Sequence, residues 1–320
     1  MTFSKEVKNE ILKSFSALSP CCEIVALACI FRTIGSISLT QKGLGLAVTS
    51  ESKEVVKFIG MTVEKLFGSN AEIVEESASS SSHGPRFQIT VSEAEEILLQ
   101  CGIVSRDENG FRQINEIFDN RLLEDKCCQK VFVKSIFVGA GSVTLPDANR
   151  EGYHMEFGLS NQSITDSLLT SFREFEMSPK KLVRKNESVI YFKGGEEISD
   201  ALALMGATKS LFQLQNLIVE RSVRNNANRQ TNCISANIDK MVEAAEKQLV
   251  AIRIIEAAVG LNSLPEKLKE AAILRRENIS ESLDELSAIS CGSVTKSGLN
   301  HRFRKIIEIA DEIKNKEESL

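Results

Sequence analysis

The sequence has no hydrophobic run of the ~20 residues that a transmembrane helix needs, because polar residues interrupt every apolar stretch before that length. Its first residues alternate charged and apolar side chains and lack the apolar core of a secretory signal. They predict instead an amphipathic helix with Val7, Ile11 and Leu12 on one side. We therefore expect a cytoplasmic protein with no membrane partner.

Patterns of metal ligands are also missing. The chain has only three histidines, and none forms a helical pair with another type of ligand. Its eight cysteines include two adjacent pairs, Cys21-Cys22 and Cys127-Cys128, whereas zinc sites usually separate their ligands by two to four residues. Without export signals the thiols are expected to be reduced, and we interpret them as small buried hydrophobic residues. The sequence thus predicts no metal and no cofactor.

Basic residues are not in excess, since the net charge is −5. Residues 221–320 carry 16 basic and 15 acidic side chains, whereas the preceding 220 residues carry 23 and 29. Two segments, 221–238 and 291–305, contain basic residues with no acidic residue between them. We expect any contact with nucleic acid to lie in these segments and not in the N-terminal part.

The clearest feature present is an internal repeat at an offset of 106 residues. Residues 30–39, IFRTIGSISL, align with residues 136–145, IFVGAGSVTL, and five of the ten positions are identical. The same offset aligns the two Cys-Cys pairs. The repeat therefore predicts two related halves, at 1–125 and 126–210.

Each half is predicted to have the order αββαββα. The first helix of each half is expected to end at Gly35 or Gly141, with glycine supplying a left-handed cap. The expected strands are 36–39, 44–49, 71–75 and 86–91 in the first half, and 142–145, 153–159, 181–185 and 188–193 in the second. The expected later helices are 52–67 and 92–101, then 162–175 and 195–205; residues 76–86 form a hairpin tip. This domain is of the α+β class.

The plan resembles the LAGLIDADG homing-endonuclease fold over about two thirds of the chain. In that family two motif helices pack at a pseudo-dyad through small residues. Here Cys29 and Thr33 share one helix face, as do Ser135 and Gly139. The alternative is a pair of ordinary core helices.

The resemblance also provides a test for catalysis. In active members, an acidic residue just before the glycine that ends each motif helix holds a metal ion at the scissile phosphate. Those positions are Ile34 and Ala140 here, and neither side chain can ligate a metal. Because these two positions are degenerate, we expect that the chain is inactive as a nuclease and is not an enzyme.

From residue 248 the pattern is purely helical, and we expect an all-α helix-turn-helix domain at 248–320, joined to the repeat domain by a linker helix or segment at 211–247. One helix spans 248–260 and is stopped by Gly260. The next spans 264–278, with Pro265 in its first turn. Ser282 and Glu285 have the spacing of a capping box that starts a short helix.

The last helix has the composition of a recognition helix. Leu299, Phe303 and Ile306 form its core face, and Thr295 is its expected N-cap. Its polar residues can contact phosphates or base edges; the candidates are Lys296, Ser297, Asn300, His301, Arg302, Arg304 and Lys305. The alternative is an ordinary solvated amphipathic helix.

The string VTKSGLNHRFRKI at 294–306 resembles the signature of the WhiA family of sporulation regulators, as do residues 224–240 and 260–270. With Cys127-Cys128 and VKSIFVGAGSV at 133–143, the resemblance spans nearly the whole chain. It implies a degenerate LAGLIDADG domain joined to a helix-turn-helix, in a transcription regulator of sporulation or cell division. One departure is Phe303, where leucine is usual.

The polar segment 221–232 has two interpretations. Its asparagines can cap helix ends at the domain junction, or Arg224 and Arg229 can bind the phosphate backbone. The leading hypothesis for the chain is a nucleoid-associated regulator that binds double-stranded DNA at promoters. The alternatives are an active nuclease, and a non-catalytic adaptor whose repeat domain binds protein or RNA.

Overall fold

The structure is a computed structural model that describes residues 2–41, 43–76, 85–147, 152–185, 187–290 and 292–317. The chain forms two compact units, Met1–Glu220 and Arg221–Leu320. Among the described residues, no helix combines the length and the apolar character that crossing a bilayer requires.

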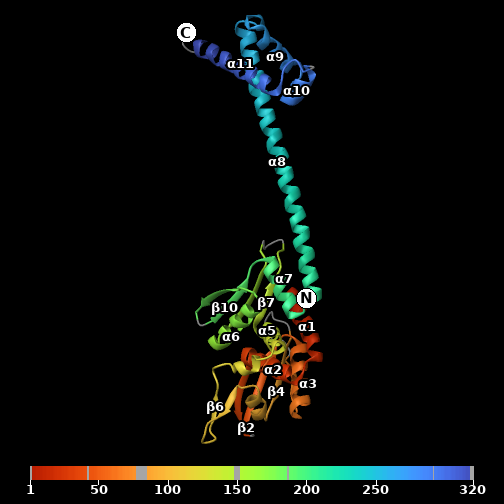
Figure 1. Cartoon of the computed structure of the whole chain (residues 1–320), viewed down its shortest axis with the longest axis vertical. Helices are drawn as coiled ribbons and strands as arrows, with labels where there is room; N and C mark the ends of the chain where they lie inside the picture. The colour runs from red at the N-terminus through yellow and green to blue at the C-terminus, as the bar shows by residue number, and fades with distance from the viewer. Residues whose placement is uncertain are drawn as a thin grey trace. The chain divides into compact units, whose positions relative to one another are not determined.

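The first unit contains the two predicted halves (Figure 1). The first half comprises α1 Phe3–Ser14, η1 Phe15–Ala17, α2 Pro20–Ile34, β1 Gly35–Thr40, β2 Gly43–Ser50, α3 Lys53–Phe67, β3 Glu72–Glu76, β4 Arg86–Val91 and α4 Glu95–Gln100. The second comprises α5 Lys126–Ala140, β7 Gly141–Thr144, β8 His154–Leu159, α6 Gln162–Glu174, β9 Lys180–Arg184, β10 Glu187–Phe192 and α7 Gly195–Met205. The predicted order αββαββα is confirmed in both halves. Val7, Ile11 and Leu12 of α1 are buried as expected.

Each half has one four-stranded antiparallel sheet, with strand orders β1-β2-β4-β3 and β7-β8-β10-β9. The equivalence of the two orders reflects the sequence repeat. Residues on alternate positions of β2 and β4, such as Leu46, Val48 and Ile89, are buried against the helices. Strands β3 and β4 form the predicted hairpin, while its tip at 77–84 lies outside the described residues.

Helices α2 and α5 pack against each other at the centre of the unit, and the predicted small-residue contact is confirmed. A Cβ atom added to Gly139 of α5 would overlap Thr33 Oγ1 and lie 2.9 Å from Thr33 Cβ. Ser135 is fully buried on the same helix. At the other end of the contact, the Sγ atoms of Cys22 and Cys128 are 3.7 Å apart. The residues that the repeat aligns therefore meet across the pseudo-dyad.

The expected role of the glycines that end these helices is wrong. Gly35 and Gly141 both have φ −88°, in the extended region, so neither is a left-handed cap. In each half the strand starts at the glycine itself. The chain turns sharply there, so the glycine lies against the last turn of the helix. An added Cβ would lie 2.9 Å from Phe31 Cα at Gly35 and 2.7 Å from Phe137 Cα at Gly141. Close approach of the backbone, and not a positive φ, requires glycine here.

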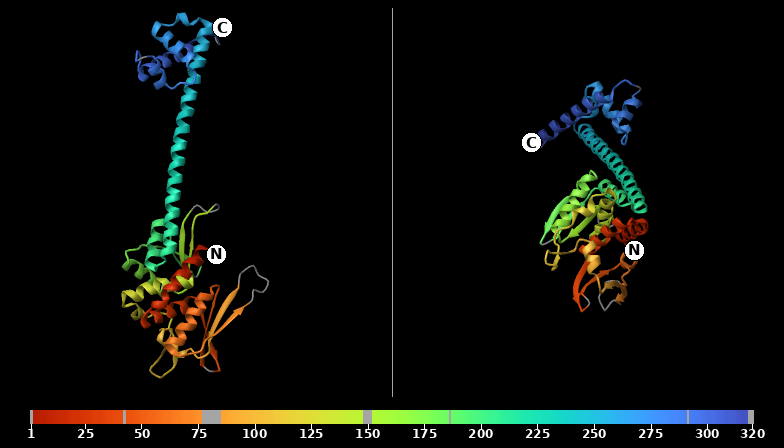
Figure 2. Two further views of the ribbon diagram at one scale, coloured as in Figure 1. Left: turned by 90° about the vertical axis from the view of Figure 1, so that its right-hand side faces the viewer. Right: turned by 60° about the horizontal axis from the view of Figure 1, so that its bottom comes forward.

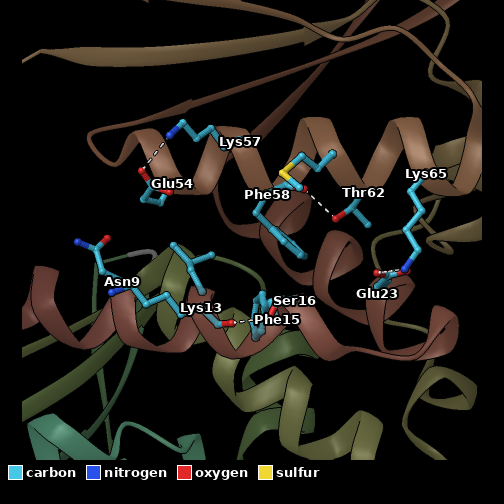
Figure 3. Close-up of a pocket in the computed structure, with 12 residues that line it drawn as sticks. Asn9, Lys13, Phe15, Ser16, Glu23, Glu54, Lys57, Phe58, Thr62 and Lys65 are labelled. Carbon is cyan, nitrogen blue, oxygen red and sulfur yellow. Dashed lines mark hydrogen bonds and ion pairs between the residues drawn. The ribbon is translucent and has the colours of Figure 1, made fainter.

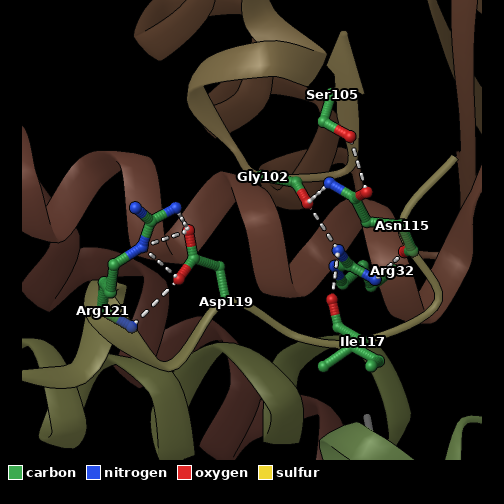
Figure 4. Close-up of polar contacts among 7 residues, drawn as sticks. All are labelled: Arg32, Gly102, Ser105, Asn115, Ile117, Asp119 and Arg121. Carbon is green, nitrogen blue, oxygen red and sulfur yellow. Dashed lines mark hydrogen bonds and ion pairs between the residues drawn. The ribbon is translucent and has the colours of Figure 1, made fainter. Parts of the chain in front are cut away.

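The segment between the halves contains a small hairpin that the sequence analysis missed, β5 Val104–Arg106 and β6 Arg112–Ile114, followed by η2 Asn120–Leu123. Arg32 of α2 holds this segment in place (Figure 4). Its guanidinium donates to the carbonyls of Gly102 at 2.8 Å, Asn115 at 2.9 Å and Ile117 at 3.3 Å. Burial lowers the pKa of Arg32. One charged side chain thus satisfies three carbonyls of an irregular segment.

The second unit begins within α8 Thr208–Ala258 and continues with η3 Leu261–Ser263, α9 Glu266–Glu277, α10 Leu283–Ile289 and α11 Lys296–Glu317. These helices are visible in both figures of the whole chain (Figures 1 and 2). Its core is a separate apolar cluster that includes Ile252, Ile255, Leu268, Ala272, Leu286, Leu299, Phe303 and Ile306. The predicted core face of the last helix is therefore confirmed.

Helix α8 corrects two expectations. It is a single helix of 51 residues, so the helix expected to begin at 248 begins 40 residues earlier. Gly260, with φ 75°, follows its end as predicted. Because residues 221–232 lie in the helix interior, their asparagines cap no helix end, and the capping interpretation is wrong. Pro265 is the N-cap of α9 and not a residue of its first turn.

Candidate nucleic-acid interface

The last two helices have the geometry of a helix-turn-helix. Ser282 and Glu285 form the predicted capping box at the start of α10. After α10 the turn is closed by Ser287 Oγ, which donates to the carbonyl of Val294 at 2.7 Å. Thr295 Oγ1 then accepts from the Gly298 amide at 3.2 Å, which confirms it as the cap of α11. Both helix starts are thus fixed by side-chain caps.

The beginning of α11 presents polar side chains to solvent. Ser297, His301 and Arg304 follow at spacings of four and three residues, so they lie on one face of the helix, and all three are exposed. Asn300 and Lys305 are also exposed beside this face. The arrangement combines cationic groups with side chains that can hydrogen-bond to base edges. The positive end of the helix dipole lies at the same end.

Two of the candidate residues have partners within the unit. Lys296 Nζ lies 2.6 Å from Asp284 Oδ2, and both side chains are mostly exposed. An exposed pair of this kind contributes about 0–1 kcal/mol, so a phosphate can compete with Asp284 for Lys296. Arg302 differs because its side chain is 19% exposed and faces α9. It donates to the Lys267 carbonyl at 3.1 Å, so it supports the packing of α11.

A buried arginine positions α11 in the unit. Arg275 of α9 is 2% exposed, and its Nε donates to Gln248 Oε1 of α8 at 2.9 Å. One of its terminal nitrogens donates to the Glu281 carbonyl at 2.6 Å. Its guanidinium carbon lies 5.4 Å from the ring centre of Phe303, a cation–π distance. Burial lowers the pKa of Arg275. The aromatic ring that departs from the family pattern is therefore buried against a cation, and sequence reasoning found only its apolar role.

The two basic candidate residues of α8 are exposed, as a DNA contact requires. Arg224 and Arg229 are both on the surface of the helix. They are five residues apart, which separates them by about 140° around the helix axis. A single flat surface therefore cannot contact both guanidinium groups, although a curved partner can.

The sheet surfaces differ between the halves. On the first sheet, the residues opposite the buried face are mainly Ser36, Ser38, Thr40, Thr49, Gln88 and Thr90, and Arg86 is the one basic side chain among the described strand residues. On the second sheet, Lys180 and Arg184 of β9 flank Leu182 on the exposed face beside Tyr191. The sequence analysis missed this basic edge because it summed charge over the whole N-terminal part.

One of the two degenerate positions, Ile34, lies beside lysines. Ile34 and Gly139 line a cavity of about 290 Å³ together with Lys5 and Lys8 of α1. Glu51 is the one carboxylate among the described residues that line it. Burial lowers the pKa of Lys8 to about 8, against an opposing effect of Glu51. One carboxylate beside two amines is a poor donor set for a divalent cation, which needs several oxygen ligands.

A second cavity, of about 790 Å³, lies between α1 and α3 (Figure 3). The rings of Phe15 and Phe58 form its apolar floor, with centres 5.0 Å apart. Lys65 Nζ lies 2.6 Å from Glu23 Oε1 at one end of it. Glu23 is 5% exposed, and its other oxygen has no hydrogen-bond partner within the part of the chain that the structure describes. Nothing in the sequence indicated this cavity, because its lining comes from α1, η1, α2 and α3, which are separated along the chain.

Known proteins match nearly the whole chain. Family models match in order: the WhiA N-terminal LAGLIDADG-like domain over 20–104, the WhiA LAGLIDADG-like domain over 129–224, and the WhiA C-terminal HTH domain over 227–310. The "Probable cell division protein WhiA" of Clostridium botulinum is 33% identical over 318 residues, covering 98% of this chain and 99% of that protein. The protein of the same name in Alkaliphilus metalliredigens is 30% identical over 320 residues and covers 99% of each.

A solved structure supports the same fold. The crystal structure of full-length DUF199/WhiA from Thermatoga maritima matches with a TM-score of 0.56 at 23% identity, covering 98% of this chain and 99% of that one. The predicted fold class, an α+β LAGLIDADG-like repeat domain followed by a helical helix-turn-helix domain, is therefore confirmed.

Proposed function

Because the chain belongs to the WhiA family, we propose that it is a nuclease-inactive transcription regulator that binds specific sequences of double-stranded DNA. The relatives are named as probable cell division proteins, and we assign this chain to the same process or to sporulation. Promoter regions on the nucleoid are its proposed sites of action.

The observation that carries the proposal is the exposed N-terminal face of α11. Ser297, His301 and Arg304 lie on one side of a helix whose opposite side is buried through Leu299 and Phe303. The capped α10 and the short turn hold this face outward. In a helix-turn-helix, the first residues of the second helix contact base edges in the major groove. We assign base contacts to Asn300 and Arg304.

The remaining cationic residues are assigned to the phosphate backbone. Lys296 is the first residue of α11, where the helix dipole also attracts anions, and exposed Lys305 lies about two and a half turns further along the helix. Arg224 and Arg229 are proposed as additional backbone contacts from α8. Arg302, which faces α9, is assigned a positioning role in place of a direct contact.

Inactivity as a nuclease is supported by the residues at the motif-helix ends. Ile34 and Ala140 have no oxygen ligand, and Lys5 and Lys8 lie in the cavity beside Ile34. A metal-dependent nuclease needs carboxylates there to hold the ion and activate water. We expect purified protein with Mg²⁺ or Mn²⁺ to leave plasmid DNA intact. Nicking that co-purifies with the chain and is lost on substituting one of its acidic residues would refute this part.

DNA reading is tested on full-length protein with a site taken from a genome-wide map of bound DNA. Asn300→Ala and Arg304→Ala should each weaken binding to that site by about 1–3 kcal/mol, or five- to 150-fold. Lys296→Ala should weaken all duplexes alike and reduce the salt dependence by about one counterion. Lys314→Ala is the matched control, because this exposed lysine of α11 lies about 15 Å along the helix from Arg304. Unchanged affinity in both reading variants would reject α11 as the reader.

The second candidate is a non-catalytic adaptor that binds protein or RNA through the repeat domain. The cavity between α1 and α3, with its buried and half-paired Glu23, is the observation that favours it. Binding assays on the full-length protein distinguish the two functions. If the chain is only an adaptor, it has no salt-sensitive affinity for duplex DNA, and its α11 variants still bind the partner.

A further inference from the structure

The two Cys-Cys pairs occupy equivalent places at the pseudo-dyad. Cys21 and Cys22 are the second and third residues of α2, and Cys127 and Cys128 are the second and third residues of α5. Within each pair the first cysteine is exposed and the second is buried. We call these four residues the dyad cysteine cluster.

The sulfur atoms of the cluster lie at distances that suit a metal ion. The Sγ atoms of Cys22 and Cys128 are 3.7 Å apart. Those of Cys21, Cys22 and Cys128 all lie within 4.8 Å of one another. In a tetrahedral zinc site, with Zn–S bonds of about 2.3 Å, neighbouring sulfurs are about 3.8 Å apart. Cys127 lies in a second, overlapping group with Asp125 and Cys128, whose ligand atoms also all lie within 4.8 Å of one another. A fourth ligand would therefore come from Cys127 or Asp125.

The surroundings favour thiolates once an ion is present. The cluster lies at the N-termini of two long helices, each with a partial positive charge of roughly half an elementary charge. Ser19 Oγ lies 3.1 Å from Cys21 Sγ, within hydrogen-bonding distance of this sulfur. A bound cation stabilises each thiolate directly, because a thiol that coordinates a metal ion is deprotonated.

We propose that the dyad cysteine cluster binds one thiophilic metal ion of the Zn²⁺ class and thereby joins the two halves of the repeat domain. Each coordinating thiol releases its proton to solvent on binding. The exposed cysteine of each pair gives the ion a path from solvent, and the buried one encloses it.

The other cysteines of the repeat domain do not share this arrangement. Cys29 and Cys101 are fully buried, and burial raises the pKa of Cys101 to about 12. Its thiol lies 3.9 Å from the Ile24 carbonyl. Cys29 and Cys101 are therefore small buried core residues, as the sequence analysis predicted for all the cysteines. That prediction is wrong for Cys21, Cys127 and Cys233, which are exposed. Spacing along the sequence concealed the cluster because each half supplies only one pair.

The test uses full-length protein purified with a reductant and without chelators, and probed with Zn²⁺ and with Co²⁺. We expect one Zn²⁺ per chain after desalting, and on Co²⁺ exchange the absorption of a tetrahedral thiolate complex. Cys21→Ser/Cys127→Ser changes only the exposed pair and spares the core. It should weaken Zn²⁺ binding by more than about tenfold, since loss of an outer-shell partner alone costs 10- to 100-fold.

Two matched variants control for thiol number and burial. Cys233→Ser removes an exposed cysteine outside the cluster, and Cys29→Ala removes a buried one from the same helix. Both should bind Zn²⁺ like the parent. The proposal is overturned if reduced protein retains no Zn²⁺ and gives no thiolate spectrum with Co²⁺, or if the cluster variant binds Zn²⁺ unchanged. A Cys22–Cys128 disulfide in protein isolated without oxygen would also overturn it, because those sulfurs would not be available as ligands.

Discussion

Replacing Gly139 by alanine is expected to destabilise the repeat domain through the contact of α2 with α5. The added Cβ would overlap Thr33 Oγ1 and lie 2.9 Å from Thr33 Cβ. Thr33 cannot turn away without a loss, because its hydroxyl donates to the Cys29 carbonyl at 2.9 Å and lies 3.0 Å from that of Ile30. The overlap involves Cβ itself, so relief requires movement of one helix.

The size of the effect is the difference between two terms. Overpacking of a tight core costs about 1–3 kcal/mol, and this overlap belongs at the upper end. Alanine in a helix gains up to about 1 kcal/mol over glycine. We therefore expect the free energy of unfolding to fall by about 2 kcal/mol. Gly60→Ala in α3 is the matched control, since its nearest neighbours are flexible side-chain ends at 3.3 and 3.6 Å. It should be neutral or slightly stabilising.

The assay can isolate the repeat domain. The sequence has no tryptophan, and its two tyrosines, Tyr153 and Tyr191, both lie in the first unit. Urea unfolding followed by tyrosine fluorescence therefore reports that unit. Thr33→Gly in the Gly139→Ala background should restore part of the loss, with a coupling energy of about 1–2 kcal/mol. If Gly139→Ala alone is as stable as the parent, the helices do not approach as described.

Three further substitutions test other parts of the molecule. Arg275→Met should cost about 1–3 kcal/mol by leaving buried Gln248 unpaired; helical circular dichroism should record the loss while tyrosine fluorescence does not change. Phe303→Ala should cost about 3–5 kcal/mol by the same measurement, and an unchanged melt would contradict its burial. The pKa of Lys8 is about 8 in the folded protein, against an ordinary value of 10.5. Between pH 8 and pH 10.5 the folded state therefore binds fewer protons than the unfolded state, so the free energy of unfolding rises with pH over this range. Lys8→Met should abolish that rise and add about 1–3 kcal/mol near pH 7; a pH profile of urea midpoints identical to the parent's would refute it.

Much of the repeat domain could be predicted because local signals and the repeat agree. Strand β4 and helix α7 have the predicted bounds, 86–91 and 195–205. Helix α7 is bounded by Gly194 and by Gly206, which has φ 71°. Alternation of apolar residues then specifies which strand face is buried. The repeat extends each assignment from one half to the other.

The sequence analysis allowed a linker helix at 211–247 but missed its continuity with the helix predicted at 248–260, because the middle of α8 is unusual for a helix. Asparagine-rich stretches have weak helix propensity and favour turns, and the exposed residues 221–232 have no apolar face toward a core. One signal was available, since no glycine or proline occurs between Gly206 and Gly260. An uninterrupted segment of that length favours one continuous helix over a linker.

The candidate site could also be predicted only in part. The face of α11 follows from helical spacing, so its exposed residues could be predicted individually. The partners of Lys296 and Arg302 could not, because Asp284 and Glu270 belong to other helices. Arg275 was not identified for the same reason: its role depends on Gln248 and Phe303, which are distant in sequence.

The residues at the ends of the motif helices explain why packing of the pseudo-dyad does not require a metal ion there. Two carboxylates facing each other at the ends of α2 and α5 would repel, and a bound metal would have to compensate that repulsion. With Ile34 and Ala140 in their place, no such compensation is needed, and the lysines of α1 can lie beside the same cavity. The close contact of Gly139 with Thr33 is independent of that chemistry, because it depends only on small side chains. Packing of the dyad and catalysis at its end are therefore separable, and a second unit with its own apolar core can provide DNA recognition.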